Sequence, residues 1–163
     1  MKTLLIVYHS RTGGTAQMAA TAAEAAGAEA EVRTRLLPAA AAAPEDVLAA
    51  EGYLFAAPEN LAALAGLMKE FFDRCYYPVL GRIEGRPYAS LICAGTDGRN
   101  AAAQIARIAT GWRLRPVAEP FILRNGAQTP EAILAPKRLT PAELAPCAEL
   151  GGALAAGLAA GIF

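Results

Sequence analysis

The sequence of 163 residues has no net charge, one histidine and few cysteines. Because its basic residues balance the acidic ones and are scattered, it lacks the basic patch of proteins that bind nucleic acid or anionic membranes. Its cysteines, Cys75, Cys93 and Cys147, are far apart and odd in number, which is typical of reduced core thiols. We therefore expect a cytoplasmic protein without a disulfide, a metal site, or a nucleic-acid or membrane partner.

The single histidine excludes further classes. His9 adjoins Ser10 at the end of an apolar segment, and neighbouring residues leaving a strand point to opposite faces, so they cannot form the hydrogen bond that a serine hydrolase needs. The same two residues stand where a phospho-acceptor signalling domain would need carboxylates. The apolar start ends at His9 without a signal-peptide cleavage site, and the Ala/Gly-rich end over 151–163 is too short to span a bilayer.

The segment from Ser10 to Thr15 is the most informative feature that is present. It follows the apolar run 4–8 and precedes an alanine-rich stretch, so it connects a strand to a helix. Successive backbone N–H groups and several hydroxyls can converge there on one anion, which predicts a phosphate monoester as ligand. The dinucleotide fingerprint needs Gly-x-Gly-x-x-Gly and the triphosphate loop needs Gly-Lys followed by Ser or Thr, and the segment has neither pattern. The alternative is an ordinary turn with Thr12 as N-cap.

Apolar runs of strand length alternate with segments of helical period along the chain. This pattern predicts one domain over 1–163, built as a parallel sheet with helices on both faces. Pro116 and Pro120 bracket the last strand, so it belongs at an edge of the sheet. The expected strands are 3–8, 31–36, 52–57, 88–94 and 115–119.

Helices are expected over 16–26, ended by Gly27, around residues 64–75 and 105–112, over the short stretch 45–50, and after Thr140. Apolar residues repeat at helical spacing over 64–75. We assign these residues and Trp112 to the core rather than to cofactor contacts. They are Leu64, Leu67, Met68, Phe71, Phe72 and Cys75. The stretches 38–44 and 121–137 are expected to be loops, the second covering either the site or a partner subunit.

Ligands of open parallel sheets bind outside the carboxyl ends of the strands, where the winding direction reverses. The loops after the first, third and fourth strands should therefore meet. They cover 9–15, 58–61 and 95–100, and all are rich in small or polar residues. Asn60 is expected to take a left-handed backbone conformation in the middle loop.

These segments resemble a known superfamily. The pattern Ser10-x-Thr12-Gly13-x-Thr15 resembles the FMN-phosphate loop of flavodoxin-like proteins. The stretch Ala57-Pro58-Glu59-Asn60, followed by Gly66-x-x-Lys69-x-Phe71-x-Asp73-Arg74, is similar to the NAD(P)H-dependent FMN/quinone reductase branch. The resemblance implies an α/β flavodoxin-like three-layer sandwich with a five-stranded parallel sheet in order 2-1-3-4-5.

The resemblance also implies a site for noncovalently bound FMN, with NAD(P)H as electron donor. Three groups of residues would bind the cofactor by analogy, and none of them is assigned as catalytic. The phosphate would contact Ser10, Thr12, Gly13, Gly14 and Thr15, with Arg11 at the phosphate or over the ring; one edge of the isoalloxazine would contact Pro58, Glu59, Asn60 and Leu61; the other side would contact Gly95, Thr96, Asp97 and Gly98.

Two features separate this chain from electron-carrier flavodoxins, which usually flank the flavin with aromatic rings and carry strong negative charge. Neither ring-side loop contains Trp or Tyr, and the net charge is zero. We therefore expect a reductase that passes hydride from NAD(P)H through the flavin to a quinone, another flavin or a similar small-molecule acceptor. The alternative is a noncatalytic electron carrier or an FMN-binding interaction protein. By analogy, a homodimer is expected.

Overall fold

The computed structural model describes residues 1–163 and contains a central parallel sheet in the order β2-β1-β3-β5-β6. The strands are β1 (Lys2–Tyr8), β2 (Val32–Pro38), β3 (Gly52–Asn60), β4 (Ala63–Leu64), β5 (Pro87–Ala94), β6 (Arg115–Pro116) and β7 (Phe121–Arg124). β4 pairs with β3, and β7 pairs with β5, outside this order. The sheet therefore has five main positions. The predicted order 2-1-3-4-5 is confirmed.

The fifth position of the sheet is divided between two strands, which corrects the prediction of one strand over 115–119. β6 pairs with the start of β5, and β7 pairs with its end, from Leu91↔Phe121 to Ala94↔Arg124. Pro116 and Pro120 have no N–H to donate, so the ladder is interrupted between the two parts. The expectation that 121–137 is a loop is therefore wrong for its first four residues, and also for 130–134, which form the short helix α5.

The end of β3 differs from prediction as well. The strand runs to Asn60 and turns back as an antiparallel pair with β4, where Glu59 faces Leu64 and Asn60 faces Ala63. The left-handed residues are Leu61, with φ of 50°, and Ala62, with φ of 60°, rather than Asn60. A short antiparallel turn thus replaces the simple loop expected at 58–61.

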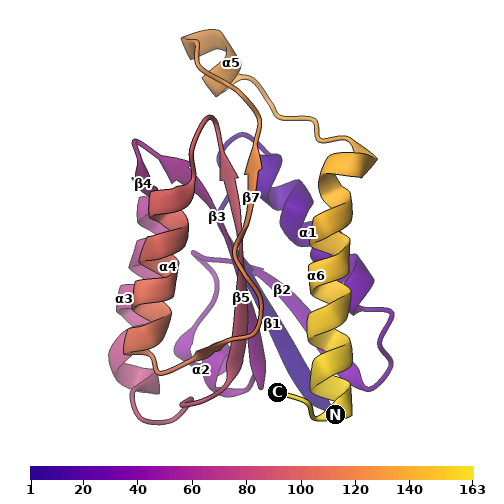
Figure 1. The fold of residues 1–163 in the computed structure, drawn as a ribbon. Helices are drawn as coiled ribbons and strands as arrows, with labels where there is room; N and C mark the ends of the chain where they lie inside the picture. The colour runs from indigo at the N-terminus through magenta and orange to yellow at the C-terminus, as the bar shows by residue number, and fades with distance from the viewer.

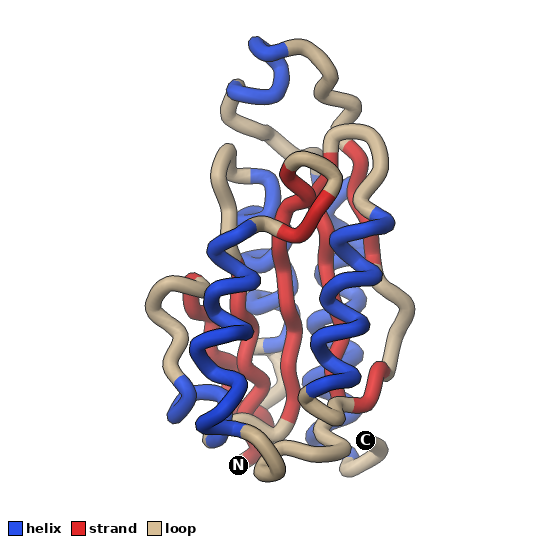
Figure 2. The backbone as a smooth tube through the Cα atoms, turned by 90° about the vertical axis from the view of Figure 1, so that its left-hand side faces the viewer, coloured by secondary structure: helices blue, strands red, loops and turns tan.

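Helices cover both faces of the sheet (Figure 1). One face carries α1 (Gly14–Ala26) and α6 (Pro141–Ala160); the other carries α3 (Gly66–Val79) and α4 (Arg99–Gly111), which lie side by side in Figure 2. The short α2 (Pro44–Leu48) packs with α3, whereas α5 (Pro130–Leu134) projects beyond the end of the sheet. None of these helices combines the length and the apolar character needed to cross a bilayer.

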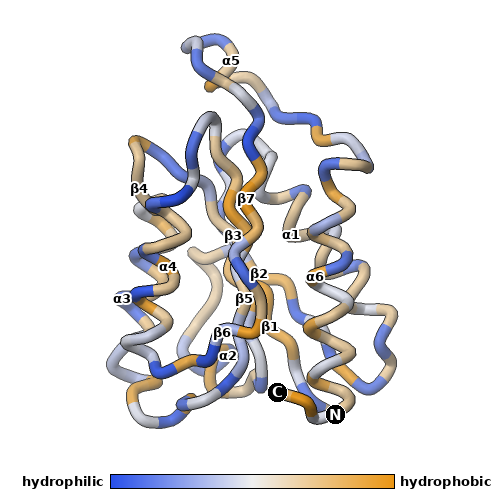
Figure 3. Tube along the Cα trace, viewed as in Figure 1, coloured by the Kyte–Doolittle hydropathy of each residue, from blue (hydrophilic) through white to orange (hydrophobic).

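Alternation along the strands produces a core on each face of the sheet. Leu4 and Ile6 of β1 belong to the cluster under α1 and α6, whereas Leu5 and Val7 belong to the cluster under α3 and α4. Hydrophobic residues accordingly follow the central strands in Figure 3. Apolar side chains therefore cover both faces of the sheet, which leaves the strand ends as the place for a functional site.

The aromatic stripe assigned to the core is buried there. Met68, Phe71, Phe72, Cys75 and Trp112 are each at most 3% exposed, and Phe72 meets Trp112 edge to face at 5.3 Å between ring centroids. Leu64 is also buried in this core, although it precedes α3, so Leu67 is the one member of the predicted stripe that lies outside the core. Leu64 lies in β4, and Leu67 is 51% exposed.

Candidate functional site

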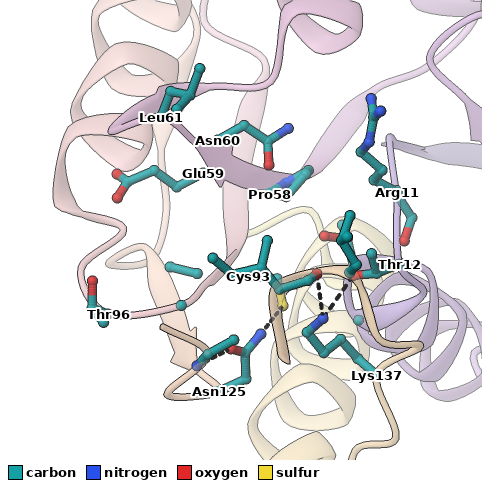
Figure 4. Close-up of a pocket in the computed structure, with 18 of the residues that line it drawn as sticks. Arg11, Thr12, Pro58, Glu59, Asn60, Leu61, Cys93, Thr96, Asn125 and Lys137 are labelled. Atoms are coloured by element: carbon teal, nitrogen blue, oxygen red, sulfur yellow. Dashed lines mark hydrogen bonds between the residues drawn. The ribbon is translucent and has the colours of Figure 1, made fainter. Parts of the chain in front are cut away.

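A cavity of about 510 Å³ lies at the carboxyl ends of β1, β3 and β5, where the predicted loops meet. Its volume is within the range of small-molecule sites. The cavity (Figure 4) is lined by Ser10, Arg11, Thr12, Gly14, Thr15, Pro58, Glu59, Asn60, Leu61, Ala62, Cys93, Ala94, Gly95, Thr96, Asn125, Ala127, Ile133, Leu134 and Lys137. None of these side chains is aromatic.

Eleven of the fourteen residues predicted to bind a cofactor line this cavity, and three do not: Gly13, Asp97 and Gly98. Gly13 and Gly98 are the N-caps of α1 and α4, with left-handed φ of 98° and 91°. Asp97 forms an ion pair of 2.7 Å with Arg99. This ion pair and the Arg99 hydrogen bonds lower the pKa of Asp97 to about 2.

The N-terminus of α1 opens into the cavity without a side-chain cap. The backbone N–H of Gly13 donates to Ser10 Oγ at 3.2 Å, which leaves the serine hydroxyl free to donate elsewhere. Thr12 is not the N-cap, so the ordinary-turn alternative does not describe this loop. Unpartnered N–H groups of a first helical turn and nearby hydroxyls together favour an anion.

Close packing holds α1 against β5 at this point. A Cβ on Gly14 would lie 2.7 Å from Cys93 Sγ, so any larger residue would force either this side chain or the helix to shift. Cys93 is 6% exposed, and burial raises the pKa of its thiol. The thiol is therefore a neutral wall of the cavity at neutral pH.

The opposite wall is the turn between β3 and β4, which α4 holds in place. Glu59 accepts hydrogen bonds from the backbone N–H groups of Gly98 at 2.8 Å and Ala101 at 3.1 Å. Asn100 Nδ2 donates to the carbonyl of Ala62 at 2.6 Å, next to the left-handed Leu61, which is fully exposed. The carboxylate of Glu59 thus binds the N-terminus of α4, and the backbone of Glu59 lies at the cavity rim.

Sequence reasoning missed the third wall, which comes from the segment after β7. Asn125 and Gly126 donate backbone hydrogen bonds to the carbonyls of Ala94 at 2.9 Å and Gly95 at 2.8 Å. Ile133 and Leu134 of α5, and Lys137 after it, also line the cavity. The only signal in the sequence was the long aperiodic stretch 121–137, which was expected to cover either the site or a partner subunit.

Ionisable groups at the site offer no acid–base pair. Burial and the nearby Arg11 lower the pKa of His9, which follows β1. No group of three or more histidine, cysteine, aspartate or glutamate side chains gathers as a metal site. The uncapped start of α1 and the hydroxyls of Ser10, Thr12 and Thr15 are suited to holding an anionic ligand.

Solved structures with the same fold cover nearly the whole chain. An archaeal flavodoxin superposes with a TM-score of 0.77 at 17% identity, covering 96% of this chain and 98% of that one. A flavodoxin, WrbA-like protein from Agrobacterium tumefaciens gives 0.75 at 16% identity, covering 98% of each chain. The rubredoxin oxygen:oxidoreductase of Desulfovibrio gigas gives 0.77 at 17% identity over 97% of this chain but 36% of its own. The fold is therefore flavodoxin-like.

Sequence comparison identifies the family. A flavodoxin from Aquifex aeolicus (strain VF5) is 34% identical over 98 residues, which are 60% of this chain and 53% of that protein, so the match spans about half of the relative's length. The model of the NADPH-dependent FMN reductase family matches residues 35–128, more than half of the chain. The match includes the walls at 58–62 and 93–96. This chain belongs to the NADPH-dependent FMN reductase family.

Proposed function

We propose that the chain binds FMN in the cavity and uses it to pass reducing equivalents from NAD(P)H to a quinone, another flavin or a similar small acceptor. The observation that carries this proposal is the uncapped N-terminus of α1, which opens beside Ser10, Thr12 and Thr15 into an aromatic-free cavity. The family match and the flavodoxin-like fold support it.

The residues present fit the phosphate of FMN. Ser10 Oγ already accepts from Gly13, and Thr12 Oγ1 accepts from Lys137 at 3.3 Å, so both hydroxyl protons remain available to phosphate oxygens. Thr15 is 2% exposed at the base of the cavity. The N–H groups at the start of α1 add donors and the positive end of a helix dipole.

The ring would lie across the strand ends, between the 58–62 turn and the 94–96 segment. When bound, FMN would supply the redox chemistry, as the carrier of a hydride equivalent between NAD(P)H and the acceptor. The protein positions the ring and excludes other ligands. The absence of an aromatic side chain from the cavity lining supports a bound ring that a nicotinamide or a quinone would be able to approach.

A titration tests cofactor binding directly. Apoprotein titrated with FMN should quench flavin fluorescence saturably, and the Thr12→Val/Thr15→Val double variant should bind more weakly by about 1 to 3 kcal/mol per lost hydroxyl. The matched Thr12→Ser/Thr15→Ser variant keeps both hydroxyls and should stay close to wild type. No saturable quenching by the wild-type chain would overturn the proposal.

The second candidate is a noncatalytic electron carrier, which the similarity to the Aquifex aeolicus flavodoxin favours. Anaerobic mixing of the FMN-loaded protein with NADPH and with NADH separates the two. Prompt bleaching of the flavin band supports the reductase, whereas oxidised flavin that persists for many minutes supports the carrier. The homodimer stays a prediction, which light scattering of the loaded protein tests.

A further inference from the structure

We propose that Lys137 is an FMN-binding residue, whose ammonium group contacts the cofactor phosphate and so couples the segment carrying α5 to cofactor occupancy. This inference rests on the proposed function. Lys137 lies outside the Ser10–Thr15 segment, which we call the phosphate loop. It also lies outside the family match, which ends at residue 128.

Lys137 is held against the phosphate loop by its own backbone. Its N–H donates to the carbonyl of Thr12 at 2.7 Å, and its carbonyl accepts from Gln17 Nε2 at 2.8 Å. Gln17, on the first turn of α1, also accepts from the N–H of Leu139 at 3.0 Å through Oε1. The position of Lys137 beside α1 is therefore fixed by three hydrogen bonds that do not involve its side chain.

The side chain lies along the mouth of the phosphate loop, as Figure 4 shows. Its Cβ and Cγ are 3.6 Å from the point where a Cβ of Gly14 would be, and its Nζ donates to Thr12 Oγ1 at 3.3 Å. No carboxylate pairs with this ammonium group, whereas several other cations of the chain form ion pairs. The ammonium group of Lys137, which has no ion-pair partner, is therefore separated from the expected phosphate position only by the hydroxyl of Thr12.

The same ammonium group holds the end of α5. Nζ donates to the carbonyls of Ala132 at 2.9 Å, Ile133 at 2.9 Å and Ala135 at 2.7 Å. With Thr12 Oγ1 it has four acceptors for three protons, and the contact to Thr12 is the longest. A phosphate oxygen can replace that contact at little cost, because a dianionic acceptor binds an ammonium group more strongly than a hydroxyl does.

Residues 131–136 are all exposed, and α5 projects away from the sheet (Figures 1 and 2), so few other contacts fix it. Ile133 and Leu134 nevertheless line the cavity. The phosphate contact at Lys137 therefore has two consequences: it adds affinity for FMN over riboflavin, and it orders α5 over the bound cofactor.

The first test compares FMN with riboflavin, which lacks the phosphate. In fluorescence titrations, Lys137→Met should weaken FMN about 10- to 100-fold, as expected for a lost hydrogen bond to a charged group, and leave riboflavin unchanged. The salt dependence of FMN binding should also decrease. Lys137→Arg should retain most of the affinity. Arg138→Met, at the exposed neighbour outside the cavity, is the matched control and should bind both flavins like wild type.

The second test measures α5. FMN should slow proteolysis within 127–137 in the wild type, but riboflavin should not, and neither should do so in Lys137→Met. Equal losses of FMN and riboflavin affinity in Lys137→Met, or unchanged FMN affinity in the folded variant, overturn this inference and leave FMN binding intact. If the wild-type chain binds neither flavin, the proposed function itself fails.

Discussion

The carboxylate of Glu59, at the end of β3, accepts a hydrogen bond of 2.8 Å from the backbone N–H of Gly98, the N-cap of α4. The glycine has no side chain to cap its own helix, and among backbone N–H groups the neighbouring Asp97 accepts only from the next one, that of Arg99, at 3.2 Å. A residue 39 positions earlier therefore supplies the cap. Because the same segment forms a wall of the cavity, the geometry of the site depends on this hydrogen bond.

Removal of this cap should destabilise the fold. Glu59→Ala leaves the N–H groups of Gly98 and Ala101 without a partner, and we expect the free energy of unfolding to fall by about 1 to 2 kcal/mol, as for other N-cap losses. Glu59→Gln keeps one acceptor and should fall between Ala and wild type. Urea denaturation measures both.

The control is Asp97→Asn, one residue before Gly98. Asp97 pairs with the exposed Arg99, and asparagine keeps an oxygen that can accept from the Arg99 N–H, so this substitution should leave the free energy of unfolding close to that of the wild type. Equal losses in Glu59→Ala and Asp97→Asn would mean that general charge near α4, rather than the cap, stabilises the helix.

The resemblance to flavodoxin-like proteins implied the sheet order, whereas the meeting of the three loops was predicted from local pattern and from the rules of parallel sheets. The sequence did not predict the role of Glu59. A glutamate after Pro58 is equally consistent with a ligand contact, and its actual partner lies on another element. Only the tertiary structure shows that the carboxylate stabilises α4.

Lys137 is a second residue whose role could not be predicted from the sequence. It lies in an exposed, aperiodic stretch 125 residues after Thr12, with no repeat or motif around it. Its contact with the loop depends on the path of the chain after β7, which the interrupted fifth strand determines. Local secondary-structure propensity does not indicate that the chain returns to the loop at Thr12.

Arg74 gives a second stability prediction. Its guanidinium donates to the carbonyls of Ala42 at 2.5 Å and Ala39 at 2.8 Å, so it fixes the alanine-rich stretch before α2. Arg74→Met should lower the free energy of unfolding by about 1 to 3 kcal/mol, because two carbonyls lose a charged donor. Thermal or urea unfolding measures the change.

Lys69, on the same helix, provides the comparison for Arg74. Its ion pair with Asp73 is exposed on both sides and involves no distant carbonyl. Lys69→Met should therefore cost at most about 0.5 kcal/mol. A loss for Lys69→Met as large as that for Arg74→Met would contradict the assignment of Arg74 to the 39–42 carbonyls.

The buried thiols predict a loss of stability at alkaline pH. Burial raises the pKa of Cys75 and Cys147 from 9.0 to about 11. Above pH 9 the unfolded chain releases these protons while the folded chain retains them, so their contribution is complete below pH 9 and declines as the pH rises toward 11. Urea midpoints at pH 7.5, 9 and 10.5 should fall in that order.

The double variant Cys75→Ala/Cys147→Ala tests the cause of this alkaline loss. It should be less stable than wild type at pH 7.5, because it leaves cavities, but its stability should decline less between pH 9 and 10.5. An unchanged slope would assign the alkaline loss instead to Cys93, Tyr53 and Tyr88, whose pKa values burial also raises.

Two adjacent glycines in α6 offer a matched pair for helix packing. A Cβ on Gly151 would overlap the backbone carbonyl of Ala22 in α1, whereas a Cβ on Gly152 would meet nothing within 4 Å. Gly151→Ala should therefore push α6 from α1 and cost about 1 to 3 kcal/mol through overpacking. Gly152→Ala should instead stabilise the protein by about 0.5 to 1 kcal/mol, because alanine loses less backbone entropy in a helix. Thermal unfolding measures the two changes, and effects of the same sign would show that the close approach of α1 and α6 does not control the packing.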